Sequence, residues 1–190
     1  GRVLMEQFKL MDNFKEEIVV KRNRTLDQIL YGFCWISIVV FGLIALTSFY
    51  GIIGATGFNW VSLVIAVVFG ALAFLLWRNK DKLRTEYEYS FTNGDLDISM
   101  VLGNSRRRYL TRLPLKSVEA CGLVTDPSFN RYVSMRDVKK HNWFLNRDAK
   151  LYYFYFTKNS VKHLIVIEPS DEMVEMIRSR NYLNYGVWQG

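Results

Sequence analysis

The chain has 190 residues and a mass of 22.3 kDa, and half of its residues are hydrophobic. Three prolines and no low-complexity tract exclude a disordered chain and a collagen-like fibre, and two cysteines exclude a disulfide scaffold. The net charge of +7 indicates an anionic partner, either nucleic acid or a membrane surface. The mean hydropathy of +0.02 conceals an uneven distribution of the charges.

A block without any formal charge runs from residue 28 to residue 77. One helix needs about 20 apolar residues to cross a bilayer, so the block suits two crossings. The breaker-rich stretch GIIGATGFN lies between them and predicts helices over 29–50 and 60–77. A buried hairpin of a soluble protein is the alternative, but both helices are apolar on every face and aromatic rings mark their ends: Tyr50, Trp60 and Trp77.

Basic residues flank the charge-free block, whereas its connecting turn has none. The net charge is +1 over residues 1–27, +3 over 78–84 and +3 over 85–190. The positive-inside rule therefore predicts that both termini are cytoplasmic, with the linker 78–84 supplying juxtamembrane anchors: Arg78, Lys80, Lys82 and Arg84. Because the positive charge is explained by the side of the membrane on which these segments lie, nucleic acid is not an expected partner.

Small residues at helical spacing lie on one side of the second predicted helix: Ala66, Gly70 and Ala73. Such a stripe lets two helices approach closely. It fits packing against the first helix of the same chain, and it also fits an oligomer or a partner membrane protein.

The segment before the hairpin, residues 1–27, contains apolar residues at helical spacing among charged ones: Phe14, Ile18 and Val19. Asp12 would cap such a helix. We expect an amphipathic helix that either lies on the inner membrane surface or packs on the following domain. Residues 1–10 carry no such pattern, and we expect the native chain to start at Met11.

After Thr85 the pattern changes to alternation, which is typical of half-buried strands. Asn93-Gly94 and Gly103-Asn104 predict hairpin turns, and a third strand over Arg106–Leu113 is followed by a fourth over Lys116–Leu123. Asp126-Pro127 predicts a turn in the weakly patterned segment 125–149. The further expected elements are a short strand at Tyr132-Val133, strands over Leu151–Thr157 and Val161–Ile167, and a helix capped by Ser170 with the stripe Met173, Met176 and Ile177.

The runs EYEYSFTNGDLDI and RRRYLTRLPLKSVEA resemble a bacterial pleckstrin-homology-like (PH-like) domain over about residues 85–180. The positions that carry the resemblance are Tyr89, Thr92, Gly94, Leu96, Ile98, Leu113, Pro114, Leu115 and Val118. The layout is similar to that of small bacterial membrane proteins with two transmembrane helices and a C-terminal PH-like domain. The resemblance implies a seven-stranded bent barrel capped by a helix, and it implies no established activity.

We therefore predict a membrane α + β fold, in which a transmembrane helical hairpin is followed by a small antiparallel PH-like β-barrel with a C-terminal capping helix over 85–185. The expected location is the bacterial plasma (inner) membrane, as a multi-pass protein.

Residues suited to catalysis or metal binding are scarce. There is no Gly-rich phosphate loop and no zinc-spaced Cys/His pair, and Cys121 has no sequence-near histidine. We interpret His141 and His163 as ordinary surface or core residues and Cys121 as a small buried hydrophobe. We thus expect no catalytic residue, no metal, no cofactor and no enzymatic activity.

A basic cluster on the third strand is the main candidate binding site. Alternation places Arg106, Arg108 and Arg112 on one face, and Lys116 follows, so they could hold an anionic lipid headgroup or an acidic partner. A solvated sheet face is the alternative. The family's phosphoinositide-binding members carry bases at the first hairpin, whereas this chain has Thr92–Asp95 with an acid and no base, which disfavours a phosphoinositide pocket.

A second basic cluster beside Trp143 and Phe144 fits lipid docking or an ordinary packed loop: Arg131, Arg136, Lys139, Lys140 and Arg147. Taken together, the sequence predicts a non-enzymatic membrane protein whose PH-like domain binds a protein partner or a second copy. The alternatives are recognition of anionic lipid by the basic face and, more distantly, a membrane enzyme.

Overall fold

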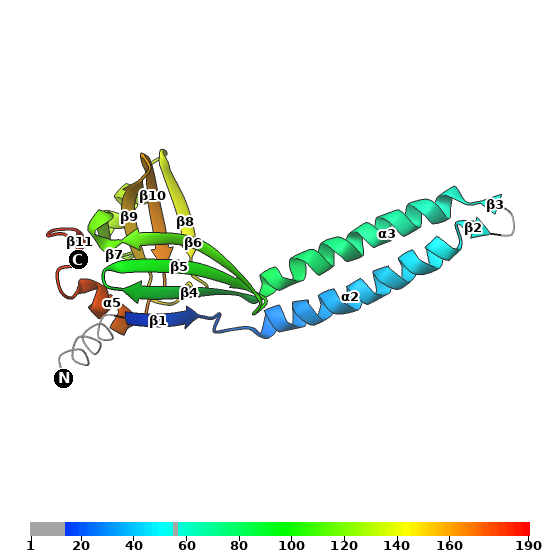
Figure 1. Cartoon of the computed structure of the whole chain (residues 1–190), viewed down its shortest axis with the longest axis horizontal. Coiled ribbons are helices and arrows are strands. Elements are labelled where there is room, and N and C mark those ends of the chain that lie inside the picture. Colours follow the sequence, from blue (N-terminus) through cyan, green and yellow to red (C-terminus); the bar gives the residue numbers. More distant parts are fainter. Residues whose placement is uncertain (1–13, 55–56) are drawn as a thin grey trace, which may run out of the picture. The chain divides into compact units, whose positions relative to one another are not determined.

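The computed structural model describes residues 14–54 and 57–190, which form two compact units (Figure 1). The helical unit comprises residues 23–85 and 102–105. The sheet domain comprises the described residues up to 22 together with 86–101 and 106–190. The expectations about residues 1–10, Met11 and the Asp12 cap lie outside the described residues.

The helical unit is an antiparallel pair of long helices, α2 (Thr25–Tyr50) and α3 (Trp60–Asn79), which Figure 1 shows side by side. Two short strands, β2 (Ile53–Gly54) and β3 (Gly57–Phe58), lie at the connecting turn. The Asn59 side chain caps α3 by accepting hydrogen bonds from the backbone of Val61 and Ser62. After α3 the chain makes a 3-10 turn, η1 (Lys80–Arg84). The two helices predicted from the charge-free block are confirmed.

Both helices are long and apolar enough to cross a membrane, and no residue of either is buried inside the protein. Large apolar side chains point outward along their length, and a core helix of a soluble protein would bury them. The helices approach closely at Gly70, where an added Cβ would lie 3.9 Å from the Ala45 Cβ, and Phe41 of α2 contacts Phe69 of α3 with ring centroids 5.5 Å apart. These two candidate membrane spans indicate that the protein is membrane-associated.

The first sheet of the sheet domain has the strand order β1-β4-β5-β6. Its strands are β1 (Phe14–Val19), β4 (Thr85–Thr92), β5 (Asp95–Leu102) and β6 (Arg106–Pro114). The β4–β5 turn has positive φ at Asn93 (50°) and Gly94 (95°), as a two-residue type I′ hairpin requires. The sequence prediction of this hairpin is confirmed.

The second sheet has the order β11-β7-β9-β10-β8. Its strands are β7 (Val118–Leu123), β8 (Val138–Trp143), β9 (Tyr152–Lys158), β10 (Val161–Ile167) and β11 (Trp188–Gln189). A short 3-10 turn, η2 (Leu115–Ser117), precedes β7, and the helices are α4 (Pro127–Val133) and α5 (Asp171–Arg178).

The core has two layers separated by β9. Phe154 and Phe156 pack in the larger cluster, whereas Tyr153 and Tyr155 pack in the smaller one with α4 residues. The buried Tyr89 of β4 links the sheets, because its hydroxyl donates to the Trp143 carbonyl and accepts from the Glu168 backbone N–H (3.2 Å). β9 is thus buried on both faces, as its aromatic sequence predicts.

Four expectations differ from the structure. The sheet domain is not purely antiparallel, because β10 pairs parallel with β8 and β11 pairs parallel with β7. Within the described residues the two sheets share no strand, so the predicted closed barrel is not confirmed. The helix predicted around Phe14–Val19 is wrong, since these residues form β1 and pair antiparallel with β4. The strand predicted at Tyr132-Val133 is also wrong, because these residues end α4, which Asp126 caps with Pro127 at its start.

Candidate functional site

Strand β1 has a free edge. In the two-residue hairpin after Thr92, the N–H and C=O groups of Thr92 bond to β5. Backbone groups of successive residues in a strand point to opposite sides, so those of Phe91, Tyr89 and Tyr87 point toward β1. Their partners in β1 bond to β4, and the N–H and C=O groups of the intervening residues point away from the sheet: those of Phe14, Glu16 and Ile18. Among the described strands, only β4 pairs with β1.

Apolar side chains accompany this free edge. Phe14 and Ile18 are 50% and 59% exposed, and Val20, just after the strand, is 44% exposed. The other long edge strands carry several exposed bases, with three arginines opening β6 and two lysines in β8. Edge charges, lysine above all, oppose edge-to-edge pairing. β1 has one exposed charged side chain, Glu16, and no exposed base, so it is better suited than β6 or β8 to accept another strand.

A cavity of about 560 Å³ lies along the C-terminal half of β1. Its walls are residues 17–20 and Arg22, the loop 146–150, and residues 168–171 before and at the start of α5. Four carboxylates and two bases line it, and three contacts engage them in part: Ser170 N–H to Glu17 (2.8 Å), Arg22 to Asp148 (3.2 Å) and Lys150 to Asp171 (3.1 Å). The lining has a net negative charge.

Asn146 lies at one end of this cavity and holds the chain after β1 in place. Its buried side chain donates to the Val20 carbonyl (3.0 Å) and accepts from the Arg22 N–H (2.8 Å), as a neighbouring strand would. It also donates to the Glu168 carboxylate (2.6 Å), which accepts from the Leu145 and Asn146 N–H groups as well. This Asn146–Glu168 clasp holds the end of β1 to the second sheet.

The predicted arginine cluster is divided by the structure. Arg112 donates to Asp97 through Nε (2.9 Å), and this hydrogen bond lowers the pKa of the Asp97 carboxyl. Arg107, which the sequence analysis did not select, bonds to the Glu88 carboxylate and lies 3.9 Å from Glu16. A hydrogen bond with Glu16, together with burial, raises the pKa of Glu88. Arg107 and Arg112 therefore have ion-pair partners within the first sheet.

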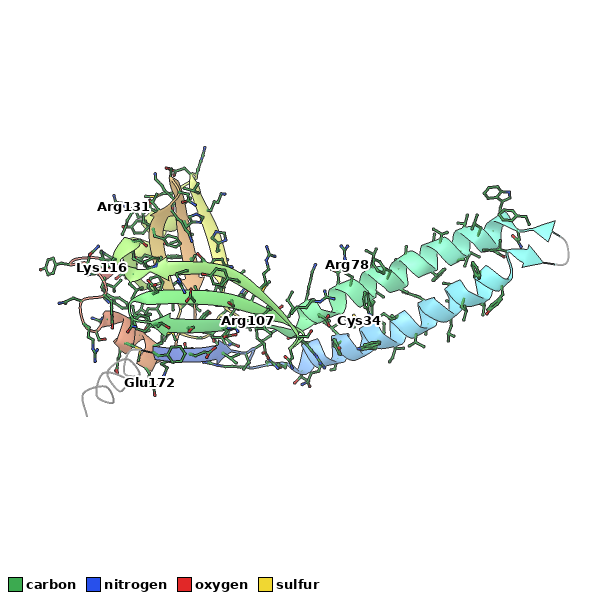
Figure 2. The ribbon with its side chains drawn as sticks, in the orientation of Figure 1. Cys34, Arg78, Arg107, Lys116, Arg131 and Glu172 are labelled. Atoms are coloured by element: carbon green, nitrogen blue, oxygen red, sulfur yellow. The ribbon has the colours of Figure 1, made fainter. Side chains whose placement is uncertain are left out.

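The other candidates lie elsewhere. Arg106 and Arg108 are exposed and have no ion pair among the described residues. Lys116 donates to the Asn181 carbonyl (2.6 Å) and lines a cavity of about 530 Å³ with Arg178, whose guanidinium lies 4.5 Å from the Trp188 ring centroid. Figure 2 shows Lys116 far from Arg107 on the sheet domain.

The second basic cluster also separates. Arg131 lies over the Tyr132 ring, 6.0 Å from its centroid, whereas Lys139 and Lys140 are exposed on β8. Arg136 and Arg147 are exposed in the flanking loops. These bases therefore lie on separate elements of the sheet domain: α4, β8 and the flanking loops.

The two histidines are half-buried and Cys121 is buried. His141 Nε2 lies 3.3 Å from His163 Nδ1, and burial lowers the pKa of both rings. Burial raises the pKa of the Cys121 thiol to about 12, so it is protonated at neutral pH. No group of three or more metal-ligating side chains occurs in the described part of the chain.

The comparison with protein families fits this arrangement of two apolar helices and a two-sheet domain. Residues 11–184 match the family described as a bacterial PH-like domain (DUF6106). The chain belongs to this bacterial PH-like family. The match includes both apolar helices as well as the sheet domain, so the hairpin is part of the family pattern. No curated protein and no solved structure matches the chain.

Sequence reasoning missed the free edge of β1 and the Asn146–Glu168 clasp. Asn146 lies in the weakly patterned segment and bonds to residues more than a hundred positions earlier. The sequence offered no clear signal for β1, because Glu16 lies between Phe14 and Ile18, where an alternating strand would have an apolar residue.

Proposed function

We propose that this bacterial PH-like protein is a non-enzymatic membrane module whose sheet domain binds an extended segment of a protein partner along β1. The observation that carries the proposal is the unpaired edge of β1, which combines outward backbone groups with exposed Phe14 and Ile18. Strand addition to a free sheet edge is a common mode of peptide recognition, in which main-chain hydrogen bonds give affinity.

The charge of the cavity along β1 determines which kind of segment fits. Its carboxylates outnumber its bases, so a segment with lysine or arginine fits better than an acidic one. Apolar side chains of the segment would pack on Phe14 and Ile18. The helical hairpin holds this surface at the cytoplasmic face of the bacterial inner membrane, with both termini cytoplasmic.

Site-specific photo-crosslinking in the full-length protein tests the proposal. A photoreactive phenylalanine analogue at Ile18 should give one discrete heavier species, identified by mass spectrometry as a partner segment. The same analogue at Tyr109 is the control, because Tyr109 is also 59% exposed and lies on β6 of the same sheet. Equal product patterns from both positions, or no product from Ile18, would contradict the proposal.

A crosslinked species with the mass of two chains would assign the edge to a second copy. Self-association is the other form of the proposed binding role.

A further inference from the structure

The four juxtamembrane bases look equivalent in the sequence, but the structure assigns them two different environments. All four follow the apolar part of α3, and the other end of the hairpin has no Lys or Arg. Only this end therefore attracts an anionic leaflet. The bases differ in whether their side chains are available to a ligand.

Two of the bases contact aromatic rings of the helices. Lys80 Nζ lies 5.2 Å from the Trp35 ring centroid and 5.9 Å from that of Trp77, and it bonds to Asp81 (3.0 Å). Its side chain is only 11% exposed. The Arg84 guanidinium lies 3.8 Å from the Tyr31 centroid. These cation–π contacts join η1 to α2, so both bases act within the helical unit.

The other two bases face outward. Arg78 and Lys82 are exposed, and their side chains make no ion pair, hydrogen bond or ring contact within the described residues. Arg78 is in the last turn of α3 and Lys82 is in the 3-10 turn that follows it, so both lie at the end of the hairpin that carries the bases. Figure 2 shows Arg78 at this end of α3. Trp77, 47% exposed, is adjacent in the chain.

We infer that Arg78 and Lys82 form a binding site for the phosphodiester of an anionic phospholipid. Arg78 would bind two phosphate oxygens through its fork of N–H donors, and Lys82 would add a point charge. The Trp77 indole suits the level of the headgroups. The inference goes beyond the binding role of β1 and rests only on the membrane insertion of the hairpin.

Spin-label spectroscopy of the full-length protein in nanodiscs measures the relative association of phosphatidylglycerol and phosphatidylcholine. The wild type should prefer phosphatidylglycerol. Arg78→Gln with Lys82→Gln should reduce the preference by up to about fivefold for each base removed. The control is Arg136→Gln with Lys140→Gln, which removes the same charge from exposed positions of the sheet domain and should retain the preference.

Each other result would overturn the site. An equal loss in both double variants would mean a diffuse attraction by net charge, and no loss in either would mean that these bases bind no headgroup. Inorganic phosphate that abolishes the wild-type preference would assign the two bases to a soluble anion. Recovery of the variants in nanodiscs shows that the hairpin is inserted, so a failure of insertion is distinguished from a failure of the site.

Discussion

In the helical unit, large apolar side chains point outward along both helices, whereas in the sheet domain most of them are buried between and behind two sheets. No residue of α2 or α3 is buried, and the helices approach each other closely at Gly70 and Ala45. The sheet domain instead has a closely packed aromatic core around β9. The difference shows that an exposed apolar side chain must be interpreted against its expected surroundings, which are lipid for candidate membrane spans and water for a sheet surface.

Polar contacts differ in the same way. In the sheet domain, buried polar groups such as Tyr89 and Asn146 connect segments that are distant in the sequence. In the helices, side-chain hydroxyls bond locally, as when Thr47 donates to the Leu43 carbonyl one turn earlier (2.9 Å). A segment that crosses a bilayer must satisfy its polar groups within itself, and the local hydrogen bond of Thr47 fits that requirement.

The largest expected effect comes from placing a charge among the outward apolar residues. Val67→Lys, at a 62% exposed position of α3, should cost about 3 kcal/mol of insertion free energy at the helix centre. Cell fractionation should find this variant depleted from the membrane.

Ile18→Lys is the matched control, since Ile18 is 59% exposed but lies on β1. This variant should remain in the membrane fraction. If the two variants fractionate alike, the distinction between lipid-facing and water-facing apolar residues is wrong.

A medium effect is expected from Asn146→Ala in the sheet domain. It leaves the Val20 carbonyl and the Arg22 N–H without their partner, and losing partners of this kind typically costs about 1–3 kcal/mol. Urea unfolding of the detergent-solubilised protein, followed by tryptophan fluorescence, should show a lower free energy of unfolding. Asn142→Ala, an exposed asparagine on β8, should leave it unchanged. If both variants lose the same free energy of unfolding, Asn146 does not specifically hold the end of β1.

The smallest effect is a pH dependence from the histidine pair. Burial and the neighbouring Lys139 lower the pKa of His141 below its ordinary value of 6.5, and burial, His141, Lys139 and Lys158 lower that of His163. As the pH falls below 6.5, the unfolded chain therefore binds protons before the folded domain does. The stability present above that pH is thus lost progressively below it.

Thermal unfolding measured from about pH 7 to about pH 5 should show this loss of stability. This pH interval lies above the ordinary pKa values of Asp and Glu. The double variant His141→Gln, His163→Gln should reduce the slope. An unchanged slope in the variant would assign the pH dependence to other groups.

Much of the architecture could be predicted from local patterns. The charge-free block specifies two helices, Asn93-Gly94 specifies a hairpin, and Ser170 does cap the C-terminal helix through the Met173 N–H. In contrast, β1 depends on the edge of β4, which is about seventy positions later in the chain. Its apolar residues at positions 14, 18 and 19 fit a helix equally well, so local pattern could not decide between them.

The candidate sites were less predictable for the same reason. Alternation alone grouped Arg112 with Arg106 and Arg108, but Asp97 pairs with Arg112. Likewise, no spacing rule distinguishes Lys80, which contacts Trp35, from the outward Arg78. These divisions depend on neighbours that only the folded chain brings together.

The central claim is that the protein presents its sheet domain on the cytoplasmic side of a membrane crossed by the two helices. Single cysteines in a chain whose Cys34 and Cys121 are replaced by alanine test this claim with a membrane-impermeant maleimide on intact cells. Phe58→Cys, in the exposed turn between the helices, should be labelled from outside, and Glu175→Cys, on the exposed face of α5, should be labelled only after lysis. Labelling of Glu175→Cys in intact cells, or protection of Phe58→Cys, would contradict the account.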